Sequence, residues 1–248
     1  MEKITKLNSR RWFDSQQMLY GMAAKAINTK NSNDRFWVYC INLYTLALIE
    51  KNREFYIANS NSSIAVADGI AVTLLEYFKD WPKRQRLTGY DVLDTLLKLH
   101  SKTSQLKCFF FGADMKTLDA IRARLLRDYG ESICVNVLAP PFSVNGLFDK
   151  DAEYIEIINS AQPDILFISL TQPKQEIWIN KNFDALDVPV AACVGAVFDF
   201  YAGNKSRAPY IFRLLGVEWI HRIFEEPRKI LNRFWYSIPV YIRYIFSR

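Results

Sequence analysis

The sequence is poor in the residues and motifs from which several common sites are built. It has only two histidines, His100 and His221, so a zinc site or a histidine-based catalytic triad has little material to form from. No G-x-G-x-x-G follows the first apolar run, which disfavours a dinucleotide-binding site, and no Walker A sequence occurs. The four cysteines keep no metal-ligand spacing and are interpreted as buried thiols in a reducing compartment: Cys40, Cys108, Cys134 and Cys193.

Long apolar runs are also missing. The longest apolar run without charge, residues 188–198, is well short of the roughly 18 residues that a membrane span needs. The first residues have no apolar segment behind their basic side chains, so they are not typical of a secretory signal. The protein is therefore expected not to cross a bilayer, which leaves attachment to a membrane surface open.

What the chain does have is apolar side chains and an uneven charge. Half of its 248 residues are hydrophobic, enough for the core of one α/β domain, and global disorder is not expected. Residues 205–248 hold nine Lys or Arg residues against three acids, so they carry the whole formal net charge of +6. The same segment holds ten aromatic residues. A basic, aromatic tail on a neutral body is therefore a separate feature to explain.

From residue 36 onwards, apolar or β-branched runs alternate with helix-like stretches. Strands are predicted at 36–41, 54–58, 64–67, 107–111, 132–138, 164–170 and 188–194. Helices are predicted at 43–51, 70–79, 90–100, 115–129, 151–161 and 173–184. This alternation predicts an α/β fold with a mainly parallel sheet and helices on both faces. Ligands bind such sheets beyond the carboxyl ends of the strands, so residues directly after each run are the candidates for chemistry.

Three segments are distinguished along the chain. Residues 1–35 are polar without clear periodicity and are predicted to be a loosely organised leader, residues 36–203 the core, and residues 204–248 a basic helical appendage. The appendage has one apolar helical face, which favours an interfacial helix on anionic lipid. The alternative is that this face packs on the core or on a second subunit. The face consists of Ile230, Leu231, Phe234, Trp235 and Ile238.

Two segments place polar side chains just after a predicted strand. Asp68, followed by Gly69, could act as a general base, although an aspartate there could also be a helix N-cap. Residues 171–176 open a helix whose free backbone N–H groups, with Lys174 and Gln175, could hold a phosphate or a sugar hydroxyl. The alternative is a capped helix on which Lys174 and Glu176 are solvated.

Further charged residues stand in unusual surroundings. Asp199 lies between two phenylalanines, which favours bonds to backbone amides or to a ligand, with a purely structural buried aspartate as the alternative. Arg86 opens a helix and could face a diphosphate. The D-x-D sequence Asp149-Lys150-Asp151 could hold a metal, but it follows a turn and opens a helix, so capping is favoured.

The order of these segments is more specific than any one of them. The series is Asn42, Val66-Ala67-Asp68-Gly69-Ile70, Arg86-Leu87-Thr88-Gly89-Tyr90-Asp91, Phe109-Phe110-Phe111-Gly112, Pro173-Lys174-Gln175-Glu176, Phe198-Asp199-Phe200-Tyr201-Ala202-Gly203, Arg207-Ala208-Pro209, Leu215-Gly216-Val217-Glu218-Trp219-Ile220-His221-Arg222 and Glu226-Pro227. It resembles the WecG/TagA/CpsF glycosyltransferase family, glycosyltransferase family 26, over roughly residues 36–235.

The resemblance implies an inverting glycosyltransferase with a Rossmann-like core that needs no metal or other cofactor. It would move N-acetylmannosamine, its uronic acid or a related hexose from a UDP-sugar to a polyprenyl-diphosphate-linked sugar. The products would feed teichoic acid, capsule or other exopolysaccharide synthesis. The enzyme would then be a cytoplasmic, peripheral protein on the inner face of the plasma membrane, held by its tail, with no nucleic-acid partner and with homo-oligomerisation left open.

The resemblance also implies roles for individual residues. Asp68 matches the proposed catalytic base, and the pocket residues by position are Asn42, Arg86 and Gln175. Asp199 matches the acid of its motif. Arginines of the appendage are implied to close over the donor diphosphate, and the candidates are Arg207, Arg213 and Arg222.

Some positions depart from the family pattern. Cys40 stands where the family often has a pocket threonine, Ser169 and Thr171 replace common glycines, and Gln172 stands where alanine or serine is frequent. These departures put the exact donor and acceptor in doubt, not the reaction class. Two other classes compete with the transferase. A Rossmann oxidoreductase is disfavoured by the missing glycine fingerprint, and a nucleic-acid binder is disfavoured by the neutral body.

Overall fold

The computed structural model describes residues 12–61, 64–102, 105–141 and 149–246. Its centre is a six-stranded, all-parallel sheet with the order β2-β1-β6-β5-β3-β4. The strands are β1 (Phe36–Ile41), β2 (Ile64–Ala67), β3 (Leu106–Gly112), β4 (Ile133–Leu138), β5 (Ile165–Ser169) and β6 (Val190–Cys193). The predicted α/β class with a parallel sheet is confirmed.

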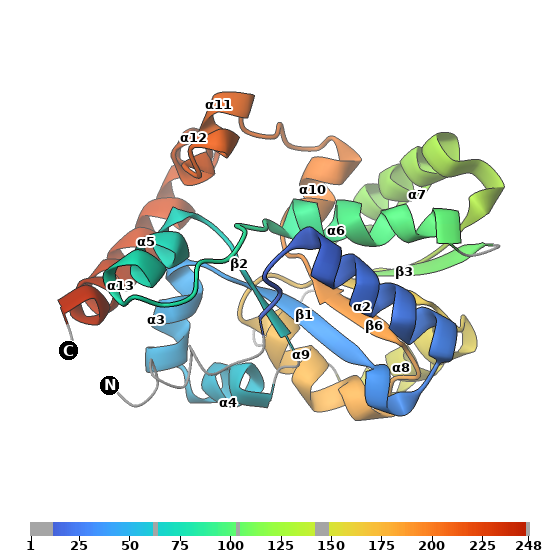
Figure 1. The fold of residues 1–248 in the computed structure, drawn as a ribbon. Helices are drawn as coiled ribbons and strands as arrows, with labels where there is room; N and C mark the ends of the chain where they lie inside the picture. The colour runs from blue at the N-terminus through green and yellow to red at the C-terminus, as the bar shows by residue number, and fades with distance from the viewer. Residues whose placement is uncertain (1–11, 62–63, 103–104, 142–148, 247–248) are drawn as a thin grey trace.

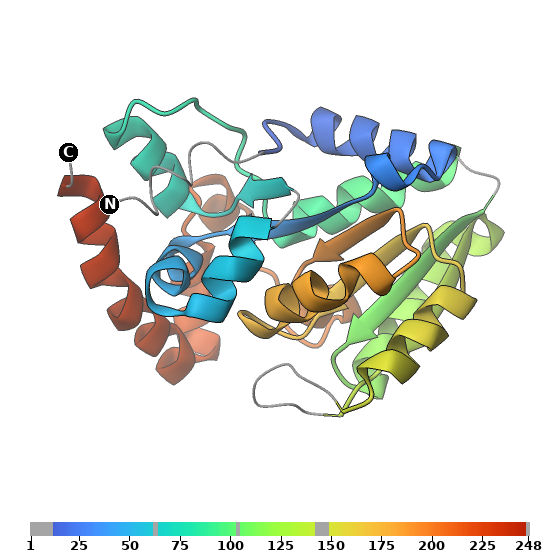
Figure 2. The same cartoon turned by 90° about the horizontal axis from the view of Figure 1, so that it is seen from below.

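Helices cover both faces of the sheet (Figures 1 and 2). One layer consists of α2 (Gln16–Thr29), α6 (Gly89–Leu97), α7 (Met115–Tyr129) and α10 (Val197–Ala202). The other consists of α3 (Leu43–Lys51), α4 (Arg53–Asn61), α8 (Asp151–Ser160) and α9 (Lys174–Asn182). Helix α5 (Ile70–Phe78) follows β2, and short 3₁₀ segments are η1 (Ser32–Asp34), η2 (Lys98–Lys102), η3 (Gly130–Ser132) and η4 (Phe183–Ala185).

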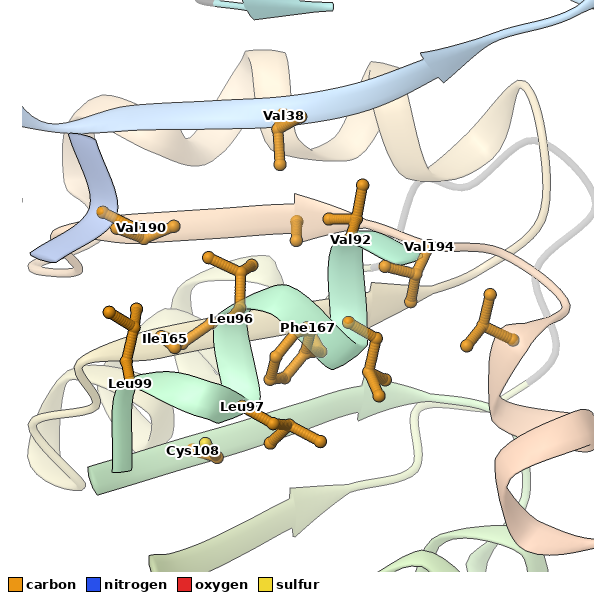
Figure 3. Packing of buried hydrophobic residues seen from close by; sticks show 14 of the residues in the cluster. Val38, Val92, Leu96, Leu97, Leu99, Cys108, Ile165, Phe167, Val190 and Val194 are labelled. Carbon is orange, nitrogen blue, oxygen red and sulfur yellow. The ribbon is translucent and has the colours of Figure 1, made fainter. Parts of the chain in front are cut away.

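The sheet separates two apolar cores because successive side chains of a strand point to opposite faces. In β1, the residues of the first core are Phe36, Val38 and Cys40, and those of the second are Trp37, Tyr39 and Ile41. Figure 3 shows the first core, where Val92 and Leu96 of α6 lie over strand side chains such as Phe167. The cysteines are free thiols; three are buried and Cys134 is half-buried.

The structure differs from the predicted elements in two places. The stretch predicted as a strand at 54–58 is part of α4, where Phe55, Ala58 and Asn59 are buried at helical spacing, so that prediction was wrong. Residues 16–29, expected to be loosely organised, form the capped helix α2. Its buried residues recur at i, i+4, i+7 and i+8 and pack into the first core: Leu19, Ala23, Ala26 and Ile27.

The appendage consists of α11 (Tyr210–Leu214), α12 (Glu218–Glu225) and α13 (Pro227–Phe246). Helix α13 packs along α3 and reaches α5 (Figure 1). It is fastened by polar contacts: the Tyr241 hydroxyl donates to the Ala71 carbonyl at 2.6 Å, and Lys51 Nζ donates to the Tyr236 carbonyl at 2.7 Å. Among the helices that the structure describes, none combines the length and the apolar character that crossing a bilayer requires.

Candidate active site

A cavity of about 410 Å³ opens at the carboxyl ends of four adjacent strands, β2, β1, β6 and β5. Helices α12 and α13 of the appendage form its roof, and α5 forms a side wall. Strand-end residues from separate parts of the chain therefore meet in one place. The predicted site residues that line the cavity are Asn42, Asp68, Arg86, Gln175, Arg207 and Arg222.

Asp68 follows β2 directly, and its backbone N–H donates to the Ile41 carbonyl at 2.8 Å, which ties it to the end of β1. The N-cap of α5 is Gly69, whose φ of +81° suits glycine, and no side chain caps this helix. The alternative explanation of Asp68 as a helix cap was therefore wrong. Its half-buried carboxylate faces the cavity instead.

The surroundings of Asp68 bring the pKa of its carboxyl closer to 7. Burial raises the pKa of this carboxyl from an ordinary 3.8 to about 6. Arg222 and Arg86 oppose the rise, Glu218 adds to it, and a hydrogen bond from Asn42 lowers the pKa. A carboxylate with a pKa near 6 is ionised at neutral pH and yet basic enough to accept a proton during reaction.

Asn42 is fixed by the start of the helix that follows it. It is the N-cap of α3, and its Oδ1 accepts from the backbone N–H and the hydroxyl of Thr45, both at 3.1 Å. Its Nδ2 is therefore directed away from the helix, where it donates to Gln172 Oε1 at 3.5 Å, and Asn42 and Asp68 line the same cavity. The capping bond thus sets the direction of the amide nitrogen that faces the candidate base.

The helix after β5 presents two buried side chains. Gln175 is 2% exposed, and its Nε2 donates to Glu176 Oε1 at 2.9 Å. Its Oε1 has no hydrogen-bond partner within the described part of the chain, although buried polar atoms are nearly always paired. Because Gln175 lines the cavity, this oxygen is available to a ligand donor such as a sugar hydroxyl.

Glu176 is fully buried, so the alternative in which it is solvated was wrong. Its Oε1 accepts from Gln175 and, at 3.1 Å, from Gln172 Nε2. Burial raises the pKa of this carboxyl to about 7, while those two hydrogen bonds and the charge of Arg233 lower it. Glu176 was not predicted as a site residue, because a single glutamate in a helix carries no sign of burial.

The roof of the cavity is cationic. Arg222 lies over the Phe200 ring at 4.9 Å, and Arg207 lies over the Tyr90 ring at 3.8 Å. Lys229 and Arg233 of α13 also line the cavity, although sequence reasoning assigned them no role there. The charged residues of the lining are Arg86, Arg207, Arg222, Lys229 and Arg233 against Asp68, Glu218 and Glu226. This surplus of positive charge suits an anionic ligand.

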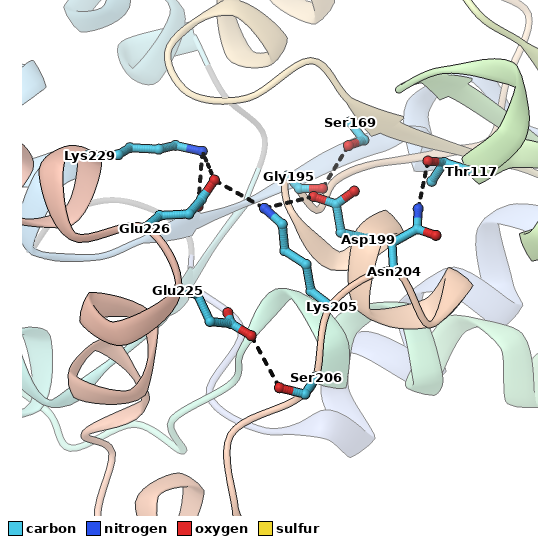
Figure 4. Close-up of polar contacts among 10 residues, drawn as sticks. All are labelled: Thr117, Ser169, Gly195, Asp199, Asn204, Lys205, Ser206, Glu225, Glu226 and Lys229. Atoms are coloured by element: carbon cyan, nitrogen blue, oxygen red, sulfur yellow. Dashed lines mark hydrogen bonds and ion pairs between the residues drawn. The ribbon is translucent and has the colours of Figure 1, made fainter.

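Two predicted site residues lie outside the cavity lining. Asp199 forms an ion pair with Lys205 at 3.3 Å, and Lys205 also contacts Glu226 at 3.1 Å, so this chain of charges links α10 to the start of α13 (Figure 4). Arg213 takes part through its backbone, because its carbonyl accepts a hydrogen bond from the Arg86 guanidinium. Both residues support the roof from outside.

The second aspartate of the D-x-D sequence, Asp151, makes a structural contact between two helices. Helix α8 begins at Asp151, whose carboxylate accepts from Trp178 Nε1 at 2.8 Å and from Lys181 Nζ at 3.1 Å, and so fastens α8 to α9. Within the described ranges, no group of three or more histidine, cysteine or acidic side chains is placed to hold a metal ion.

At the strand ends of this parallel sheet, a carboxylate with a pKa near neutrality lies beneath a cluster of guanidinium groups. This arrangement is typical of a group-transfer enzyme with an anionic donor. The model of the glycosyl transferase WecG/TagA/CpsF family matches residues 13–248. The chain belongs to this family and is a glycosyltransferase. The oxidoreductase and nucleic-acid alternatives are thereby set aside.

Curated relatives agree with the family match. An N-acetylglucosaminyldiphosphoundecaprenol N-acetyl-beta-D-mannosaminyltransferase of Staphylococcus aureus (strain MW2) is 30% identical over 187 residues, which cover 74% of this chain and 68% of the relative. A protein of the same description from Bacillus spizizenii (strain ATCC 23059 / NRRL B-14472 / W23) is 30% identical over 198 residues, covering 77% of this chain and 71% of the relative.

Proposed function

We propose that this glycosyltransferase moves N-acetylmannosamine or a related hexose from a UDP-sugar to the sugar of a polyprenyl-diphosphate-linked acceptor, with inversion, for teichoic acid or another cell-surface polysaccharide. The names of the relatives support the mannosaminyl donor and the lipid-linked N-acetylglucosamine acceptor. The observation that carries the proposal is the position of Asp68, which faces the same cavity as Gln175 Oε1 beneath the cationic roof.

In the proposed reaction, Asp68 takes the proton of the acceptor hydroxyl while that oxygen attacks the anomeric carbon of the donor. The bond between the anomeric carbon and the diphosphate oxygen breaks on the opposite side, and UDP leaves with the electron pair. Arg207 and Arg222 stabilise the charge that develops on the diphosphate. Gln175 Oε1 accepts from a hydroxyl of the bound sugar and orients the anomeric carbon.

The proposal also includes a membrane surface as the place of reaction. The predicted lipid-facing side of α13 needs revision, because Ile230, Phe234 and Ile238 line the cavity, which leaves Leu231 and Trp235 exposed. We place the lipid contact at the end of the appendage that α11 and α12 form (Figure 1). Apolar side chains there are 60–82% exposed: Tyr210, Ile211, Leu214, Leu215 and Phe224.

The test of the reaction is UDP release from a panel of UDP-sugars in the presence of a short-chain lipid-linked acceptor. Asp68→Asn should lower kcat by about 10²–10⁴ and leave the affinity for UDP nearly unchanged, because the variant loses the proton acceptor but keeps the cationic roof. Asp114→Asn is the matched control, since Asp114 caps α7 outside the cavity and asparagine caps equally well. Wild-type turnover retained in Asp68→Asn would refute the assignment of the base.

A further inference from the structure

Gln172 is the centre of a hydrogen-bond network behind the cavity wall. The two hydrogens of its Nε2 have three acceptors within hydrogen-bond distance: Glu176 Oε1 at 3.1 Å, Thr45 Oγ1 at 3.1 Å and the Cys40 carbonyl at 3.2 Å. Its Oε1 accepts from Asn42 Nδ2 at 3.5 Å and lies 3.4 Å from Thr45 Oγ1. One amide thus contacts the residues that follow β1 and the first turn of α9.

The two ends of this amide lead to the two sides of the candidate active site. On the oxygen side, Gln172 contacts Asn42, which lines the cavity together with Asp68, the proposed base, and lowers its pKa. On the nitrogen side, Glu176 accepts from Gln175, which also lines the cavity and whose Oε1 has no partner among the described residues. The groups proposed to take the proton and to hold the sugar are therefore joined through Gln172.

The backbone before Gln172 supports this geometry. Thr171 has a φ of +63°, a left-handed conformation that is unfavourable for a β-branched residue and persists only where the surroundings enforce it. The side chain of Gln172 reaches Asn42 and Glu176 together. The network is thus held in place against local strain.

We propose that Gln172 is a positioning residue for the transfer, which holds Asn42 beside Asp68 and Glu176 beside Gln175 so that base and donor sugar meet in one geometry. This role rests on the proposed function. Gln172 acts through Asn42 and Glu176 and not by touching the reacting atoms. Replacement by methionine keeps the length of the side chain but removes both ends of the amide, so Asn42 Nδ2 and Glu176 Oε1 each lose a partner.

The measurement is the titration of the Asp68 carboxyl, followed by ¹³C NMR in the full-length protein and, separately, by the dependence of kcat on pH. The charged groups that face Asp68 from the neighbouring elements are unchanged in Gln172→Met: Arg86, Glu218 and Arg222. The Asn42 hydrogen bond lowers the pKa of Asp68, so a loosened Asn42 should move the titration to higher pH. We expect kcat to fall about 10- to 100-fold through misplacement, with a smaller change in KM for the donor.

A double-variant cycle tests whether Gln172 acts through Asn42. Asn42→Ser keeps an oxygen that caps α3 but loses the amide nitrogen. If Gln172 acts through that nitrogen, Gln172→Met should not shift the Asp68 titration further in the Asn42→Ser background. Asn59→Ala is the control for a lost buried amide, since Asn59 donates to the Tyr39 hydroxyl at 2.7 Å outside the cavity and its loss should leave the Asp68 titration in place.

An Asp68 titration that stays at the wild-type position in folded Gln172→Met, or equal shifts with and without Asn42, would overturn the proposal. These results do not depend on turnover. Failure of the proposed function has a different signature, namely no UDP release by the wild-type protein with any UDP-sugar and lipid acceptor.

Discussion

Helix α12 carries two opposite charges that act on the Asp68 carboxyl. Measuring how each charge shifts the pKa of Asp68 therefore tests its proposed role as the base. Arg222 is the strongest of the charges that lower its pKa, and Glu218 raises it. With a pKa of about 6, Asp68 is about 90% ionised at pH 7 and about 10% ionised at pH 5. If ionised Asp68 is the base, kcat/KM of the wild-type enzyme, which reports the free protein, should fall roughly tenfold over that interval.

The perturbations are Arg222→Gln and Glu218→Gln, which remove one charge each with little change in size. Arg222→Gln should move the acidic limb of kcat/KM to higher pH by about one unit, the low end of the effect of a nearby opposite charge on an aspartate. Glu218→Gln should move it to lower pH. It removes a like charge and also frees Arg86, which lies 3.7 Å from Glu218 and itself lowers the pKa of Asp68.

The assay is kcat/KM for the donor, measured from pH 5 to pH 9 at donor concentrations below KM and with saturating acceptor. Arg222→Gln is also expected to lower the plateau, because the roof loses a charge that faces the diphosphate, but the position of the limb is read independently of its height. Arg122→Gln is the control for a lost surface guanidinium, since Arg122 pairs with Asp119 on α7, away from the cavity. Limbs that coincide in the wild type and both α12 variants would refute the electrostatic account of Asp68.

Two further predictions concern stability and membrane contact. The pKa of Glu176 in the folded protein is about 7, above its ordinary 4.5, so its contribution to stability is complete below pH 4.5 and is lost as pH rises through 7. Between pH 5 and pH 8 the wild type should lose about 2–3 kcal/mol of unfolding free energy more than Glu176→Gln in urea titrations, and equal pH slopes would contradict this. Replacement of Ile211 and Leu214 by serine should reduce flotation with anionic liposomes while leaving UDP binding intact, and undiminished flotation would place the lipid contact elsewhere.

The strand ends are readily located from the sequence because buried parallel strands are nearly continuous apolar runs that stop at a polar residue. Both β1 and β2 end where predicted, so the apolar pattern by itself places Asn42 and Asp68 at the edge of the sheet. The same rule misassigned residues 54–58. A short run such as Phe55-Tyr56-Ile57-Ala58 does not distinguish a buried strand from one turn of a buried helix.

Contacts between distant segments could not be predicted in this way. Gln172 and Glu176 acquire their surroundings only when α9 docks beside β1, and no local pattern distinguishes them from solvated residues. Asp199 has an unusual local sequence, but the structure places it against Lys205 outside the cavity lining. Periodicity predicted the apolar face of α13, but it does not show what that face packs against. In the structure, Ile230 and Phe234 of that face line the cavity.

In the proposed reaction the roof does more than bind the donor, because the pKa of the proposed base depends on it. Asp68 is half-buried beneath α12, and burial is the largest cause of its raised pKa, with Arg222 as the main opposing charge. A diphosphate bound at Arg222 brings negative charge next to the cation that holds the pKa of Asp68 down. The proposed base then becomes stronger when the donor is in place, and weaker again once UDP has left. In the proposed reaction, donor binding and proton acceptance are in this way coupled through the guanidinium of Arg222.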